Sequence, residues 1–150
     1  MTYRVVKVDP VGNKSVARII ERMHRVCFPD MDQIVQTTHG DWWLARNDHG
    51  LPVAFAGLWP SARIDGAGYL CRAGVLPIAR GQGLQRRLIS AREREAKKKR
   101  WTVLFTDALV ENAHSQNNIV AAGYRMFRPT TPWSGESHIY FRKFLEEGVA

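Results

Sequence analysis

Hydrophobic and polar positions alternate with two different periods along the first part of the chain. Tyr3 to Val8 alternate with a period of two, which predicts a strand, and apolar positions then recur at helical spacing from Val16 to Cys27. This helix is expected to end near Phe28-Pro29, because the residue before a proline is disfavoured in helical geometry. A short second helix is expected from Asp32 to Thr37. The chain therefore begins as a strand followed by two helices.

Three strands follow as a meander. Strands over Trp42–Arg46 and Val53–Trp59 are joined by the turn Asn47-Asp48-His49-Gly50, which is typical of a hairpin connection. The chain turns again over Pro60 to Gly66, and the third strand is expected over Gly68–Leu76.

The second half is expected to hold a long helix, a buried strand, a short helix and two further strands. Their ranges are Gln82–Lys99, Trp101–Val110, Ser115–Ala122, Tyr124–Arg128 and His138–Phe144, with Gly123 as the cap of the short helix. The pattern indicates one mixed α/β layer structure with little room for a second domain. Residues 1–150 are therefore taken as a single domain.

Composition places the chain among ordinary globular domains. Its 150 residues are 45% hydrophobic, which is enough for a core of normal size. No apolar run approaches the roughly 20 residues that span a membrane. Cys27 and Cys71 are too few for a zinc site, so we expect no metal and read both as reduced thiols of a cytoplasmic protein.

The net charge of +8 is concentrated in one segment. Residues 86–100 hold eight Lys and Arg against two Glu. An anionic partner is one explanation. For Lys97 to Arg100 the favoured reading is a solvated helix end, where basic residues suit the helix dipole. A nucleic-acid partner would explain the charge, but no RNP-like, helix-turn-helix or zinc-finger pattern supports it.

Two glycines stand where a strand is expected to pass into a helix. A helix that begins after Gly81 and Gly83 presents unsatisfied amides at its positive end, and Arg80 adds charge, so the segment predicts a diphosphate site. It matches neither the P-loop pattern nor the dinucleotide fingerprint, whose third glycine position here is Arg86.

Two motifs resemble those of the GNAT N-acetyltransferases. Val75-x-Pro77-x-x-Arg80-Gly81-Gln82-Gly83-Leu84 is similar to the acetyl-CoA signature, and Asn112-x-x-Ser115-x-Asn117-Asn118-x-x-x-x-Gly123-Tyr124 is similar to a second motif. The order of elements also matches. The resemblance implies an α/β (α+β) fold, a mostly antiparallel sheet of six to seven strands flanked by about four helices, with a splay between the two central strands.

The resemblance also implies where acetyl-CoA binds. Pantetheine would pair with backbone like an added strand, a backbone amide near Val75 would polarise the carbonyl, and Gly74 is expected to ease a bulge. The implied cofactor residues are Ala73, Gly74, Val75, Arg80, Gly81, Gln82, Gly83, Leu84, Gln85, Arg86, Asn112 and Ser115. Gln85 replaces a small residue where only the amide is needed. Ile119 occupies the place of a tyrosine that many members use as general acid.

Acetyl transfer to an amine needs a base, and Asp107 is the candidate. It lies in an otherwise apolar strand, where some family members place a catalytic glutamate. The alternative is a structural carboxylate bonded to backbone or to an arginine such as Arg72. Cys71 has no histidine paired with it in sequence, and the family's usual route is direct attack in a ternary complex. A small buried thiol is therefore the favoured reading of Cys71.

The acceptor side is the least constrained by the sequence. Segments that line the acceptor cleft in similar proteins contribute Phe28, Asp41, Trp42 and Trp59, and these suit a small cationic amine or a peptide N-terminus. The expected partners are acetyl-CoA and an amine of unidentified structure, with a homodimer left open. The alternatives are a CoA-binding module without efficient turnover, a nucleic-acid-binding protein, and a structural domain that keeps only the fold.

Overall fold

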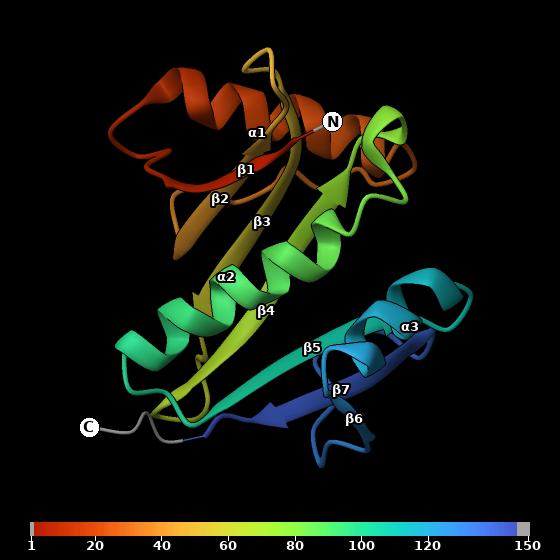
Figure 1. The fold of residues 1–150 in the computed structure, drawn as a ribbon. Coiled ribbons are helices and arrows are strands. Elements are labelled where there is room, and N and C mark those ends of the chain that lie inside the picture. The colour runs from red at the N-terminus through yellow and green to blue at the C-terminus, as the bar shows by residue number, and fades with distance from the viewer. Residues whose placement is uncertain (1, 147–150) are drawn as a thin grey trace.

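The computed structural model describes residues 2–146, which form one seven-stranded sheet and three α-helices (Figure 1). The sheet order is β1-β2-β3-β4-β5-β7-β6. The elements, in chain order, are β1 (Arg4–Val8), α1 (Lys14–Cys27), β2 (Asp41–Arg46), β3 (Pro52–Pro60), β4 (Ala67–Val75), the 3-10 turn η1 (Pro77–Ala79), α2 (Leu84–Lys98), β5 (Val103–Leu109), α3 (Ala113–Ala121), β6 (Arg125–Phe127) and β7 (His138–Phe144). The predicted fold class is confirmed.

The centre of the sheet is open at one end. Among the strand pairs of residues 2–146, β4 and β5 form the one parallel pair, and they are paired only at Ala67–Val103, Gly68–Leu104 and Tyr69–Phe105. Beyond these three pairs the strands diverge, and Figure 1 shows them spreading into a V. The predicted splay between the two central strands is therefore present.

Strand β4 carries an extra residue opposite β3. Leu70 pairs with Leu58 and Ala73 with Ala56, so Cys71 and Arg72 together face the single residue Gly57. Such a bulge changes the face to which the following side chains point. Gly74 was expected to ease a bulge, but the irregularity lies two residues earlier. Gly74 is required for a different reason, since a Cβ there would lie 2.7 Å from the Cys27 sulfur and 2.9 Å from the Phe55 ring.

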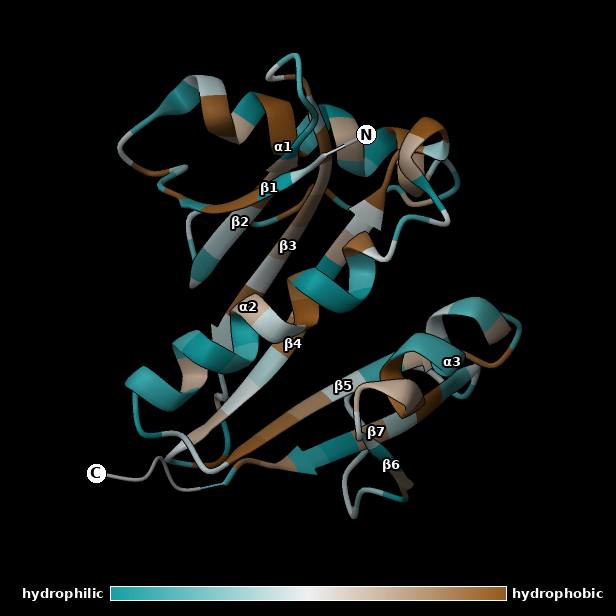
Figure 2. Cartoon of the chain, in the orientation of Figure 1, coloured by the Kyte–Doolittle hydropathy of each residue, from teal (hydrophilic) through white to brown (hydrophobic). Residues whose placement is uncertain are grey.

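The helices cover both faces of the sheet. Helix α1 buries Val16, Ile20 and Met23 against residues of β2 and β3, with Asn13 capping its first amides. Helix α2 packs Leu84, Leu88 and Ile89 on the opposite face, and its outward face is hydrophilic along most of its length (Figure 2). No helix in the part of the chain that the structure describes is long and apolar enough to cross a bilayer.

The helix expected from Asp32 to Thr37 is wrong. The segment is irregular, and although Val35 is buried, its neighbour Ile34 is 77% exposed. A helix of six residues makes few internal hydrogen bonds, and the β-branched run Ile34-Val35 lowers helix propensity further. The fold therefore has three α-helices and one 3-10 turn in the described range where about four helices were expected.

Candidate active site

A cavity of about 860 Å³ occupies the space between the diverging strands. It is lined by β4, the loop from η1 to α2, β5 and α3, with Cys27, Phe28 and Met31 from the chain after α1 and His138 from the start of β7. Ten of the twelve predicted cofactor residues line it, and Gln82 and Arg86 do not. The predicted catalytic residue Asp107 lines the same cavity.

The loop before α2 presents its backbone amides outward. Gly81 and Gly83 have φ values of +76° and +74°, and a Cβ on either would meet no atom within 4 Å. Across residues 2–146, none of the amides from Gly81 to Arg86 finds an acceptor oxygen, and Gly83 gives α2 no side-chain cap. A helix start with this many free donors is suited to a phosphate group. The Arg80 Nε donates to the Val75 carbonyl at 3.1 Å, which fixes this loop to the end of β4.

Helix α3 forms the facing wall. Asn112 caps it, because its side chain accepts from the Ser115 amide at 3.0 Å, and Asn118 donates to Gln85 on α2 at 3.2 Å. Ile119 is only 5% exposed and packs in the core, although it reaches the cavity lining. An apolar side chain therefore occupies the position at which the resemblance to the GNAT family implied a proton-donating tyrosine.

Asp107 is held by three donors. Its Oδ2 accepts from the Tyr69 hydroxyl at 2.7 Å and from the Trp133 Nε1 at 2.9 Å, while its Oδ1 lies 2.9 Å from the His138 Nδ1. The side chain is 7% exposed. These partners are neither backbone groups nor the arginine that the structural alternative named. A proton on His138 Nδ1 satisfies the carboxylate and leaves Nε2 as a base.

His138 and Tyr69 are site residues that the sequence reasoning missed. In the β5–β7 ladder Asp107 pairs with Tyr140 and Leu109 pairs with His138, so Asp107 and His138 are diagonal neighbours on one face. The signal available in the sequence was a histidine at the first position of the last strand. This histidine can be assigned to the site only when the last strand is paired with β5 in the correct register.

The buried thiol and phenol beside the cavity are held in their protonated forms. Burial raises the pKa of Cys71 to about 12, which leaves almost no thiolate at neutral pH. Burial and the Asp107 carboxylate both raise the pKa of Tyr69, so its hydroxyl remains a donor to Asp107. Cys71 is therefore unsuited to act as a nucleophile.

Only one of the four predicted acceptor residues lines the cavity. Phe28 does, whereas Trp59 packs beside Tyr69 outside the lining. Trp42 is fully buried in the core beneath α1, with its Nε1 donating to the His39 carbonyl at 2.8 Å. Asp41 pairs with Lys7 at 3.3 Å and with Lys99 at 3.1 Å. The Asp41–Lys99 ion pair also corrects the expectation that Lys97 to Arg100 are only solvated.

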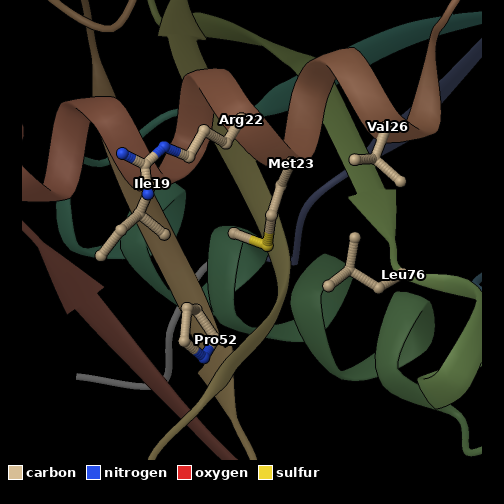
Figure 3. A pocket seen from close by; sticks show the side chains of 6 residues that line it. All are labelled: Ile19, Arg22, Met23, Val26, Pro52 and Leu76. Carbon is tan, nitrogen blue, oxygen red and sulfur yellow. The ribbon is translucent and has the colours of Figure 1, made fainter.

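A smaller cavity lies under α1. It measures about 240 Å³, and Figure 3 shows Met23 and Val26 pointing from the helix toward Pro52 and Leu76, with Ile19 and Arg22 completing its wall. Its lining is mostly apolar and includes no acid, histidine or nucleophile. The larger cavity is therefore the candidate active site.

Comparisons with known proteins show which family the chain belongs to. The family model described as Acetyltransferase (GNAT) family matches residues 14–124. An acetyltransferase of the GNAT family from Staphylococcus aureus is similar in structure, with a TM-score of 0.77 at 13% identity over 97% of this chain and 100% of that one. The ribosomal-protein-S18-alanine N-acetyltransferase from Escherichia coli has a TM-score of 0.70 at 13% identity, covering 99% of both chains.

A further similar structure is that of yncA from Salmonella typhimurium, determined with its cofactor acetyl-CoA. Its TM-score is 0.71 at 17% identity, over 100% of this chain and 98% of that chain. The search of curated proteins finds no match. The family match spans β4, the glycine loop, α2, β5 and α3, whereas β7 with His138 lies outside it. The chain therefore belongs to the GNAT family of acetyltransferases.

Proposed function

We propose that the protein transfers an acetyl group from acetyl-CoA to a primary amine by direct attack in a ternary complex. The observation that carries the proposal is the row of free amides from Gly81 to Arg86 at the mouth of a cavity that opens where β4 leaves β5. Such a row suits the pyrophosphate of CoA. Among the described residues, β4 has no strand on its β5 side beyond Tyr69, so pantetheine can pair with it as an added strand.

The reaction needs a neutral amine and a base. The amine nitrogen attacks the thioester carbonyl, so a C–N bond forms and the C–S bond breaks as the thiolate leaves. The amine proton passes to His138 Nε2 while Asp107 holds Nδ1, so Asp107 acts through the histidine. This follows from the three donors that already occupy the carboxylate.

A backbone amide and a water molecule supply the remaining two roles, which are stabilising the carbonyl oxygen and protonating the thiolate. An amide of β4 near Val75 donates to the carbonyl oxygen as negative charge develops on it. Ile119 offers no proton, so water in the open cavity protonates the departing thiolate.

We place the protein in the cytoplasm, where acetyl-CoA is available, in keeping with two cysteines that form no disulfide.

The test separates binding from turnover. Acetyl-CoA should raise the melting temperature, and a thiol-detecting assay should then show CoA release with a member of a panel of amino acids, polyamines, aminoglycosides and short peptides. Absence of any thermal shift would overturn the cofactor assignment.

The second candidate is a CoA-binding module with little turnover. The apolar Ile119 favours it, because no side chain at that position can protonate the thiolate. It predicts a normal thermal shift with acetyl-CoA and no acceptor-dependent release of CoA across the whole panel.

A further inference from the structure

In the part of the chain that the structure describes, Arg72 is a cation in the cavity without an acidic partner. It lines the cavity, its guanidinium carbon lies 6.0 Å from the centre of the Phe28 ring, and its Nη2 lies 3.4 Å from the Gln33 Oε1. Within residues 2–146, no carboxylate lies within ion-pair distance of its side chain. A guanidinium is built to bind a planar anion through two parallel hydrogen bonds.

The other charged groups of the lining are already engaged. Arg92 is buried and donates to the carbonyls of Leu88 and Gly57. Arg80 donates to the Val75 carbonyl at the cofactor end, and Asp107 accepts from its three donors. Arg72 is therefore the charged side chain that remains for a ligand at the acceptor end.

The bulge in β4 turns this arginine toward α1, the side of the sheet on which Tyr69 also packs. Cys71 packs in the cluster beneath α1, and the next side chain, Arg72, lies over Phe28, which packs against the same cluster. The extra residue thus turns two consecutive side chains toward α1. Tyr69, three residues earlier, packs against that cluster and donates to Asp107. Arg72 therefore lines the cavity from β4, whereas Asp107 and His138 line it from β5 and β7.

We propose that the acceptor is a primary amine that also carries a carboxylate, as an amino acid does. Its carboxylate pairs with Arg72 while its amine faces His138. This inference rests on the proposed function and narrows its acceptor. It replaces the small cationic amine expected from the sequence, because Asp41 lies in a surface ion-pair network instead of the cavity. Polyamines and aminoglycosides, which carry several positive charges and no anion, are disfavoured by a lining with three arginines and one acid.

The test compares acceptors that differ only in the carboxylate. Release of CoA from acetyl-CoA is measured with L-methionine against 3-(methylthio)propylamine, L-phenylalanine against 2-phenylethylamine, and L-lysine against 1,5-diaminopentane. The full set of proteinogenic amino acids is screened against spermidine and kanamycin. The carboxylate-bearing acceptors should have the higher kcat/KM, by roughly 10- to 100-fold, since a hydrogen bond between charged groups is worth about 1.5–3 kcal/mol.

Variants then assign the effect to the arginine. Arg72→Met should lower kcat/KM for the amino acid by roughly 10- to 100-fold, mainly through KM, and leave the matched amine within a few-fold. Arg72→Lys should restore part of the loss. Arg94→Met, which removes the same charge from an exposed position on α2, is the control and should change neither value. Each variant should keep the wild-type thermal shift with acetyl-CoA.

Three outcomes overturn the inference, and the first two leave the proposed function in place. The first is an enzyme that uses the matched amines or the polycations as well as the amino acids. The second is an Arg72→Met variant that affects both members of a pair equally. Failure of every carboxylate-bearing acceptor to release CoA from an enzyme that binds acetyl-CoA would also overturn it. Loss of acetyl-CoA binding itself would instead contradict the proposed function.

Discussion

The free amides before α2 can be tested with a matched pair of glycine substitutions. Gly83 and Gly50 have φ values of +74° and +76°, and a Cβ on either meets no atom within 4 Å. Gly83 caps α2 at the cavity, whereas Gly50 lies in the exposed turn between β2 and β3. Glutamate at either position suffers the same backbone strain. Only at Gly83 does it bring a carboxylate to the proposed phosphate site.

The expected magnitudes follow from these values. A side chain in left-handed geometry costs about 1–2 kcal/mol, and the lower entropy of the unfolded chain returns about 0.4–1 kcal/mol. Each variant should therefore be destabilised by about 1 kcal/mol, or about 2–4 °C in a chain of this size. Acetyl-CoA at a hundred times its Kd stabilises the fold by about 2.7 kcal/mol. A charge about 4 Å from a phosphate opposes binding by about 4 kcal/mol at an effective dielectric constant near 20, which is enough to cancel that gain.

The assay is calorimetric or fluorimetric melting with and without acetyl-CoA. Gly50→Glu should melt a few degrees below wild type and keep the full shift, whereas Gly83→Glu should melt at a similar temperature and lose it. Gly83→Lys, with the same strain and the opposite charge, should retain binding. The reasoning is refuted if a folded Gly83→Glu variant keeps the wild-type shift, or if Gly50→Glu loses it.

Three further predictions concern the cavity and the helix above it. Asp107→Asn and His138→Gln should each lower kcat by roughly 10²–10³-fold with little change in acetyl-CoA binding, and a wild-type rate in Asp107→Asn would make the carboxylate purely structural. Cys71→Ala should keep kcat within a few-fold, because the thiol pKa of about 12 leaves no nucleophile; trapping of an acetylated Cys71 by mass spectrometry would contradict direct attack. Burial lowers the pKa of His24 below the ordinary 6.5, so the unfolded chain takes up a proton at this residue at a higher pH than the folded chain does. The free energy of unfolding should therefore fall as the pH drops below about 6.5. His24→Phe should show a smaller fall between about pH 7.5 and 5.5 in urea denaturation, and equal falls would show that another group is responsible.

The order of elements was predictable because each buries one face against its neighbours. The last strand, His138–Phe144, was predicted with its observed bounds. The glycine loop was also readable, because Gly81 and Gly83 occupy backbone conformations that other residues avoid. The irregular segment after α1 could not be predicted from the sequence, because it has no continuous buried face and Val35 is its buried apolar side chain.

The partners of the site residues depend on contacts between distant segments. Asp107 receives donors from β4, from β7 and from the loop that holds Trp133, so its environment follows from sheet order and register. Trp42 and Asp41 were expected to line the cavity because of their place in the chain. Trp42 faces the core beneath α1 and Asp41 belongs to a surface ion-pair network. No local pattern distinguishes these positions from cavity positions.

The three residue pairs that join β4 to β5 have a mechanical consequence. If β4 and β5 rotated about these three pairs, the displacement would grow along the strands toward Val75 and Leu109. The width of the opening would then depend on packing far from the chemistry. At the closed end Gly68 has no room for a side chain, since a Cβ there would lie 2.4 Å from the Trp101 ring. We therefore expect a larger residue at Gly68 to act on the width of the cavity without replacing any residue that lines it.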